Sequence, residues 1–292
     1  MSNGVVYTET TCKTALNKAS GMPFEFGANP YRGCEHACGY CYARKYYARM
    51  GRDIGAGFDK AIEVRTNFPD VLRAELARRP RSSVAFGTAT DPYQQCEGRY
   101  RLMRRSLEAL LDHPMPISIV TKGTLVVRDR DLLSELSRRT GGDVRVIFSI
   151  ATLDLRFWRD LEPRTPPPSQ RLRAMRMLVD AGITAGVLLA PILPGITDSD
   201  EQLDALVSAA HEHGASMIIP SVLKLDRDIK NFVIERVAAH DSVAAGAYRE
   251  DYPGSSPKAA VRSDVDRRVR AAIRRCAFPG DVKEHERRRR AA

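Results

Sequence analysis

Short apolar runs alternate with longer amphipathic segments through the central two thirds of the chain. The runs are rich in β-branched side chains, and the segments between them repeat apolar residues at helical spacing. This pattern predicts strands at 83–87, 117–121, 144–150, 183–190 and 216–219, and helices at 69–78, 100–111, 128–138, 169–181 and 199–213. Short strands that alternate with helices of this length are typical of βαβ units and a parallel sheet.

The order of these elements predicts an α/β fold, a partial (β/α)6 barrel of the TIM type. A strand that leads into residue 29 adds a further βα unit, and 61–65 is an extra extended segment. A doubly wound sheet would place a glycine-rich dinucleotide turn after a strand, and no G-x-G-x-x-G follows any predicted strand. The barrel is therefore the predicted architecture, with its site in the loops that follow the strands.

The flanks of the barrel are less regular. Residues 1–28 show no clear periodicity, which predicts a short, loop-rich N-terminal lead-in before a barrel core at 29–225. Residues 226–292 predict a helical C-terminal extension, whose basic end at 285–292 is expected to be disordered. The extension holds two predicted helices and a turn-rich linker, at 226–239, 264–275 and 252–257.

Composition limits the location and the partners of the protein. No apolar run approaches the ~20 residues of a membrane span, and the first residues lack the features of a secretory signal. We therefore expect a cytoplasmic protein with no membrane partner and with reduced cysteines. The net charge of +10 permits nucleic acid as a partner. The excess arginines are scattered, however, which favours the simpler explanation of a soluble, charged surface.

The candidate chemistry is concentrated between residues 29 and 44. Cys34, Cys38 and Cys41 follow the spacing C-x3-C-x2-C. Three thiolates from one loop can hold three corners of an iron–sulfur cluster, and no nearby cysteine supplies a fourth ligand. An open metal position usually indicates catalysis, whereas the alternative, a zinc knuckle, needs a fourth Cys or His. His36 lies between two of the cysteines and is expected to be exposed or hydrogen-bonded rather than a ligand. The remaining cysteines are predicted bystanders: Cys12, Cys96 and Cys276.

This stretch resembles the signature of the radical S-adenosylmethionine (SAM) enzymes. The pattern Asn29-Pro-Tyr-Arg-Gly-Cys34, continued to Arg44 and followed by Gly87-Thr-Ala-Thr-Asp-Pro-Tyr-Gln94, is similar to the branch related to spore photoproduct lyase. The resemblance implies that the three cysteines bind a 4Fe-4S cluster whose fourth iron binds SAM. Reductive cleavage of SAM would then produce a radical that abstracts a hydrogen atom from the substrate. The electron would come from a donor such as flavodoxin or ferredoxin.

The resemblance also implies contacts to SAM, for Tyr40, Thr88, Thr90, Asp91, Ser149 and Arg164. Tyr40 would support the adenine. Thr88, Thr90 and Asp91 stand where the family has Gly-Gly-Glu, the motif that binds the SAM amino group. Ser149, with Thr152, would meet the ribose.

Arg164 resembles the arginine that pairs with the SAM carboxylate, a bidentate match that a guanidinium makes well. Glu162 is expected either to orient Arg164 or to pair at the surface. Lys122 is a second basic candidate, with a solvated lysine as the equal alternative. Pro191 to Gly195 would bring backbone close to the adenine. No residue is assigned a catalytic role.

Three functions are consistent with the sequence. The preferred one is a radical SAM enzyme that acts on an unidentified substrate. The second is repair or modification of nucleic acid, as in spore photoproduct lyase, which requires a basic groove at the mouth of the barrel. The third is a zinc-binding nucleic-acid adaptor without catalysis.

Overall fold

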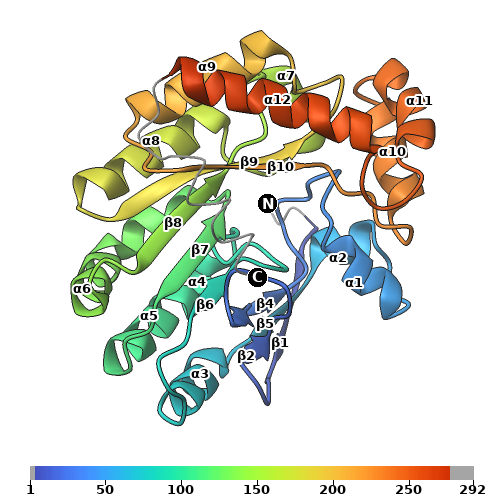
Figure 1. Ribbon diagram of the computed structural model, residues 1–292. Coiled ribbons are helices and arrows are strands. Elements are labelled where there is room, and N and C mark those ends of the chain that lie inside the picture. The colour runs from blue at the N-terminus through green and yellow to red at the C-terminus, as the bar shows by residue number, and fades with distance from the viewer. Residues whose placement is uncertain (1–3, 277–292) are drawn as a thin grey trace.

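The computed structural model describes residues 4–276 and contains a seven-stranded sheet that curves into an open barrel (Figure 1). The strand order is β10-β9-β8-β7-β6-β3-β2, and all neighbours pair in parallel except β2 and β3. The barrel is not closed, and the predicted partial barrel with six parallel strands is confirmed. The strands are β2 (Leu16–Lys18), β3 (Phe26–Ala28), β6 (Val84–Phe86), β7 (Ile117–Thr121), β8 (Val144–Ser149), β9 (Thr184–Ile192) and β10 (Ile218–Val222).

Five helices cover the convex side of this sheet (Figure 1). They are α3 (Phe68–Leu76), α5 (Leu102–Asp112), α6 (Arg130–Thr140), α8 (Pro168–Asp180) and α9 (Asp200–Glu212), and each overlaps a predicted helix. Their apolar faces bury the main core together with strand residues such as Val146, Phe148 and Val187. Short helices α4 (Glu97–Tyr100), η1 (Thr124–Asp129) and α7 (Leu155–Leu161) were not predicted, because one or two turns carry too little periodicity.

The N-terminal segment corrects one prediction, since residues 1–28 are not merely a loop-rich lead-in. They contain β1 (Val6–Thr10) as well as β2 and β3. β1 pairs in parallel with β5 (Ala61–Arg65), which also pairs with β4 (Tyr31–Arg32), so the extra extended segment belongs to a separate three-stranded sheet. These strands have only two to five residues, and their partners lie far away in the sequence. Local alternation therefore indicated β5 at 61–65 but could not reveal β1 and β4 or the pairing of the three strands.

The two faces of this small sheet differ in character. On the inner face Ile62 and Val64 pack with Tyr31 and with Cys96 and Leu102 near the start of α5. Because side chains alternate along a strand, Ala61, Glu63 and Arg65 lie on the outer face. Cys96 is buried in this apolar cluster. Its bystander role stays a prediction.

The C-terminal extension is helical through the described residues, as predicted. It comprises α10 (Lys230–Ala238), α11 (Ser242–Asp251), which was not predicted, and α12 (Ala259–Arg275). Val265, Val269 and Ile273 of α12 join the main core, and α12 lies along α9 (Figure 1). The basic end at 285–292 lies outside the described residues, and the boundaries at 28 and 225 stay predictions. No helix between residues 4 and 276 has the length and apolar character that crossing a membrane requires.

Two other short helices, α1 (Arg44–Arg49) and α2 (Ala56–Lys60), link the cysteine segment to the small sheet. Helices α10 and α11 also pack against the cysteine segment. Val233, Ile234 and Tyr248 from these two helices share an apolar cluster with Cys38 and Tyr40. The extension therefore packs against the cysteine segment.

Candidate active site

The cysteine loop, residues 33–43, follows β4 and turns sharply on itself. Gly33 has φ +78°, and a Cβ there would lie only 2.9 Å from the carbonyl oxygen of Ala61. Ala37, with φ +53°, donates its N–H to the carbonyl oxygen of Cys34 over 3.2 Å. These two turns bring Cys34 and Cys38 back toward each other.

A buried arginine holds the loop from behind. Arg44 donates through Nη2 to the carbonyl oxygen of Cys38 (2.9 Å) and to Oδ1 of Asp59 (2.7 Å). Its guanidinium carbon lies 4.8 Å from the ring centre of Phe58 and 4.7 Å from that of Phe232, both within cation–π range. Arg44 ends the sequence motif, but the sequence interpretation assigned it no role. The structure shows that it fixes the backbone between the second and third cysteines.

The three thiols of the loop influence one another electrostatically. Cys34 and Cys38 are buried and Cys41 is half-buried. Burial raises the pKa of Cys34, and Asp91 and the other two cysteines raise it further. Burial also raises the pKa of Cys38 to about 12, an effect that Lys122 partly opposes. Cys34 and Cys38 are therefore protonated near neutrality, and binding of a metal centre would release their protons.

The donor set fits a cluster better than a single ion. Among residues 4–276, no three His, Cys, Asp or Glu side chains converge to hold one metal ion. A structural zinc site gathers four ligands around one ion, whereas a 4Fe-4S cluster takes each thiolate to a different iron. His36 is buried, not exposed, and its Nδ1 lies 3.3 Å from Oδ2 of Asp91. The hydrogen-bonded alternative for His36 is thus the observed one.

Asp91 is a buried carboxylate between the cysteine loop and β7. Its Oδ1 accepts from the Thr121 hydroxyl (2.6 Å) and from the N–H of Tyr93 (2.9 Å), and its Oδ2 accepts from the N–H of Lys122 (2.6 Å). Burial would raise the pKa of this carboxyl, but His36 and these donors outweigh it and lower the pKa to about 2. Asp91 is therefore ionised, with its lone pairs directed at the protein. Its contact with the SAM amino group stays a prediction.

Gln94 joins the same rim to the cysteine loop. It is fully buried, and its Nε2 donates to Oγ1 of Thr90 (3.1 Å) and to the carbonyl oxygen of Gly33 (3.2 Å). Its Oε1 accepts the N–H of Glu35 (2.9 Å). Gln94 ends the second stretch of the family-like pattern, which was the signal that could have identified it. Thr88, on the same rim, accepts from Nδ2 of Asn29 over 3.0 Å.

Glu162 corrects another expectation, since it neither lies at the surface nor has Arg164 as its principal partner. Glu162 is 2 % exposed, forms an ion pair with the fully buried Arg171 and accepts from the hydroxyl of Tyr40. Burial would raise its pKa, but Arg171 and Lys122 outweigh that effect and lower the pKa to about 2. Arg171 lies on the amphipathic helix α8, where nothing in the sequence distinguishes it from the neighbouring surface arginines.

Lys122 and Ser149 meet beside this ion pair. Nζ of Lys122 donates to Oγ of Ser149 (2.8 Å), lies 4.0 Å from Oε1 of Glu162 and is 5.6 Å from the ring centre of Tyr40. The Lys122 side chain is only 13 % exposed, so the solvated alternative is wrong. Ser149 is the last residue of the fourth parallel strand, β8, as expected.

Other predicted contacts are less concentrated around the cysteines. Thr152 is buried and accepts the N–H of Asp154 (3.2 Å). The carbonyl oxygen of Arg164 accepts from Nε2 of Gln95 over 2.7 Å. The roles of Arg164 and of residues 191–195, which span the last two residues of β9 and the turn after it, stay predictions.

Comparison with protein families identifies the superfamily of this chain. The family model described as "Radical SAM superfamily" matches residues 28–207, more than half of the chain. The chain belongs to the radical SAM superfamily. The resemblance seen in the cysteine motif is confirmed, and the protein is a radical SAM enzyme.

Individual relatives of this radical SAM enzyme support the assignment. An uncharacterized protein of Mycobacterium tuberculosis is 38 % identical over 286 residues, which cover 96 % of this chain and 83 % of that protein. A radical SAM Nα-GlyT isomerase of Pseudomonas phage M6 is 25 % identical over 181 residues, 59 % of this chain and 34 % of that protein. A mutant spore photoproduct lyase has a similar fold, with a TM-score of 0.70 and 18 % identity over 94 % of this chain and 80 % of that one.

Proposed function

We propose that Cys34, Cys38 and Cys41 hold a 4Fe-4S cluster and that SAM binds at its open iron. Together these groups supply one-electron reductive cleavage of SAM and abstraction of a hydrogen atom from a substrate. The observation that carries the proposal is the placement of three thiols on one turn, beside Lys122, whose side chain is 13 % exposed, and the strand-end Ser149. The electron donor in this proposal is a flavodoxin or ferredoxin.

The residues around the loop would bind and orient SAM. Tyr40, Thr88, Thr90, Asp91, Ser149 and Arg164 retain the roles that the family resemblance implies. We add Lys122 as a partner of the SAM carboxylate, because Ser149 and Glu162 hold its ammonium on the side of Cys38. A desolvated cation attracts a carboxylate strongly. Arg171 would act through Glu162 by keeping that carboxylate ionised and in place.

The C-terminal extension would exclude water from the site. Val233, Ile234 and Tyr248 form an apolar wall against Cys38 and Tyr40. Exclusion of water strengthens electrostatic contacts and protects reactive species from side reactions. All six cysteines are free thiols, which is compatible with the reducing cytoplasm that we propose as the location.

Anaerobic purification and reconstitution test the proposal. We expect a brown protein with about four iron and four sulfide per chain, which forms 5′-deoxyadenosine from SAM and dithionite. Cys38→Ala should lose the cluster absorbance and the product, whereas the matched Cys276→Ala variant should retain both. A colourless protein with stoichiometric zinc would instead support the adaptor. Equal trace product from wild type and Cys38→Ala would contradict the proposed chemistry.

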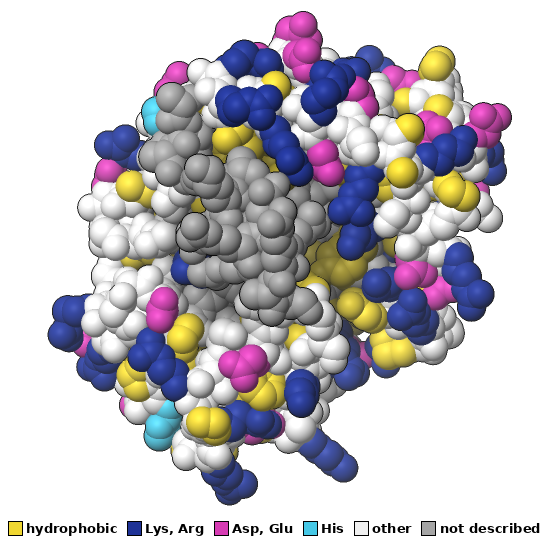
Figure 2. Space-filling view, in the orientation of Figure 1, with side chains coloured by type: hydrophobic (Ala, Val, Ile, Leu, Met, Phe, Trp, Pro, Cys, Tyr) yellow, Lys and Arg dark blue, Asp and Glu magenta, His cyan; other side chains and the backbone are white. Residues whose placement is uncertain are grey.

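Nucleic acid is a second candidate substrate. The similar fold of spore photoproduct lyase favours it, since one solved structure of that enzyme contains a dinucleoside spore photoproduct and bound AdoMet. Figure 2, however, shows Lys and Arg side chains dispersed among Asp and Glu over the visible described part of this face, with no continuous basic tract there. Incubation with deuterated oligonucleotides distinguishes the candidates. Deuterium in the recovered 5′-deoxyadenosine would support this substrate class, and its absence would count against it.

A further inference from the structure

The outer face of the small sheet is hollowed in two adjoining places. One hollow has a volume of about 250 Å³ and the other about 470 Å³, and both are lined by Thr10, Arg52 and Glu63. We call the combined space the outer pocket. It lies on the opposite side of β5 from the apolar cluster of Ile62 and Val64. The outer pocket is therefore separate from the apolar inner face of the sheet.

Positive charge dominates the outer pocket. Its charged lining consists of four cations and one carboxylate, namely Lys13, Arg32, Arg52, Arg65 and Glu63. Glu63 serves both Arg32, at 3.3 Å, and Arg52. In the part of the chain between residues 4 and 276, Lys13 and Arg65 form no ion pair, and the guanidinium of Arg65 donates only to the carbonyl oxygen of Asn29, over 3.2 Å. Burial and the nearby Arg32 lower the pKa of Arg65, as two guanidinium groups without a shared anion should.

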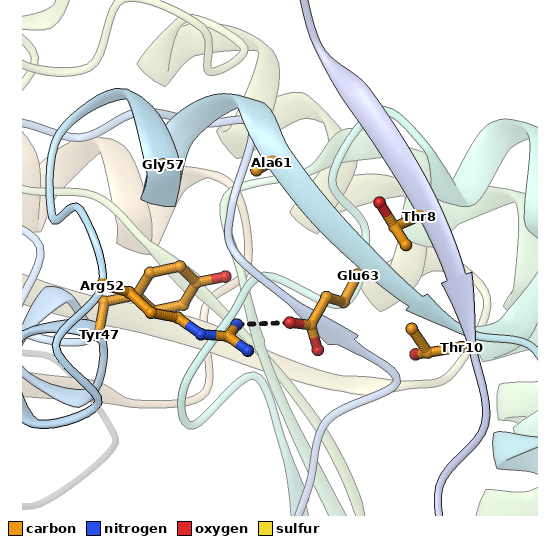
Figure 3. A pocket seen from close by; sticks show the side chains of 7 residues that line it. All are labelled: Thr8, Thr10, Tyr47, Arg52, Gly57, Ala61 and Glu63. Atoms are coloured by element: carbon orange, nitrogen blue, oxygen red, sulfur yellow. Dashed lines mark hydrogen bonds and ion pairs between the residues drawn. The ribbon is translucent and has the colours of Figure 1, made fainter.

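A buried hydroxyl without a partner also lines the pocket. Tyr47 is 5 % exposed, and its hydroxyl, although close to Arg52, has no partner with good hydrogen-bond geometry among the described residues. Figure 3 shows the Tyr47 ring and the Arg52 side chain reaching into the hollow together, toward Glu63. The Arg52 guanidinium carbon lies 5.6 Å from the centre of this ring. A buried hydroxyl that forms no hydrogen bond carries a desolvation cost, which a bound acceptor would offset.

We propose that the outer pocket binds a phosphate group carried by a nucleotide or a polynucleotide. Guanidinium groups bind phosphate oxygens in a bidentate fork, and two arginines of the lining come from different segments, Arg52 from the turn after α1 and Arg65 from β5. The hydroxyls of Thr8 and Thr10 on β1, and of Tyr47 on α1, are further donors that line the pocket. The excess of three positive charges favours an anion over a metal ion. This site goes beyond the proposed function, because it requires neither the cluster nor SAM.

Calorimetric titration of the anaerobically prepared holoenzyme tests the proposal with four probes. The probes are inorganic phosphate, thymidine 5′-monophosphate, thymidine and a short single-stranded oligonucleotide. The R52Q/R65Q variant should bind the phosphorylated probes about tenfold more weakly, and the salt slope for the oligonucleotide should fall by about 1.4, or ~0.7 for each lost contact. The charge-matched control R138Q/R227Q removes exposed arginines elsewhere and should bind like wild type.

Tyr47→Phe provides a second, independent variant. Removing a hydroxyl without a partner should leave the melting temperature unchanged or raise it, while phosphate binding weakens about threefold. Tight oligonucleotide binding with weak monophosphate binding identifies a strand as the source of the phosphate, and equal binding identifies a free nucleotide. The proposal is overturned if thymidine binds as well as its monophosphate, if no probe binds, or if R52Q/R65Q and its control behave alike.

Discussion

Two buried carboxylates flank the cysteine loop, and they are held in different ways. Asp91 rests on donors that are mostly neutral, the hydroxyl of Thr121 and two backbone N–H groups, with His36 as its only side-chain base. Glu162 rests on charge, because Arg171 pairs with it directly and Lys122 lies 4.0 Å away. Both groups have a pKa lowered to about 2.

The difference indicates what each carboxylate contributes. A carboxylate held by backbone donors fixes the relative positions of the strands and loops that supply those donors. Glu162 has two cations near it, and Arg171 forms the direct ion pair. Lys122, the more distant cation, can therefore also interact with a second anion. The Asp91 side therefore anchors the surrounding strands and loops, and the Glu162 side is the one that would receive the anionic ligand in the function proposed above.

The largest loss of stability is expected when the ion pair between Glu162 and Arg171 is broken. Arg171→Met should lower the free energy of unfolding by about 3–5 kcal/mol, because it leaves Glu162 buried with a single, more distant cation. Denaturant titration measures this loss. The matched control Arg176→Met, on the same helix and paired with Asp180 at the surface, should cost less than ~0.5 kcal/mol. Equal losses in the two variants would remove the distinction between the two carboxylates.

Acid titration should show the ionised state of Glu162 in the apoprotein. Its folded pKa of about 2 lies below the unfolded value of about 4.3, so its contribution is fully present above the unfolded pKa and is lost as the pH falls toward 2. The contribution amounts to roughly 3 kcal/mol. Unfolding free energies measured from pH 5 to pH 2 should fall less steeply for Glu162→Gln than for wild type. Parallel curves would show that Glu162 is not ionised in the folded protein.

Substitution of Asp91 should lower the free energy of unfolding by less than substitution of Arg171. Asp91→Asn keeps one acceptor oxygen but turns an amide toward donors, so about 2 kcal/mol of unfolding free energy should be lost. Asp112→Asn, which weakens only an exposed pair with Arg73, serves as the control and should change little. A loss for Asp91→Asn as large as that for Arg171→Met would reverse the ranking of the two sides.

The smallest loss of stability is expected for substitution of Tyr40, whose hydroxyl donates to Glu162. Tyr40→Phe removes the hydroxyl that donates to Glu162 but keeps the ring stacked on Phe157, so it should cost about 1 kcal/mol. Tyr47→Phe removes a hydroxyl that has no partner among the described residues and should cost nothing. Thermal unfolding of both variants provides the measurement, and equal losses would contradict the role of Tyr40 as a donor.

Much of the barrel could be predicted because its signals are local. The strands at 117–121 and 144–149 and the helices that follow them repeat apolar residues at the period of their own structure. The small sheet could not be predicted in this way, since β1 and β5 are short and pair across more than fifty residues of chain. Only the pairing of β1 with β5 places a residue such as Thr8 in the lining of the outer pocket.

The candidate site likewise contains residues that local sequence identified and residues that only the tertiary structure placed. The motif around Cys34, Cys38 and Cys41 resembles the superfamily's signature, and this resemblance needed no knowledge of the fold because the motif lies within one short stretch of chain. Gln94, Lys122 and Arg171 acquired their places only in three dimensions. Each acts on a group supplied by another segment: Gln94 on the cysteine loop, Lys122 on the end of β8, and Arg171 on Glu162.

The sequence by itself therefore determined the superfamily, the open βα barrel and the three cysteines, all of which follow from spacing and periodicity along one stretch of chain. Only the tertiary structure decided that Glu162 pairs with Arg171, that the largely shielded Lys122 meets Ser149, and that β1, β4 and β5 with the segment around Arg52 line a basic outer pocket. The physical reason is that burial and charge pairing depend on which distant segments come together. No local pattern records that information.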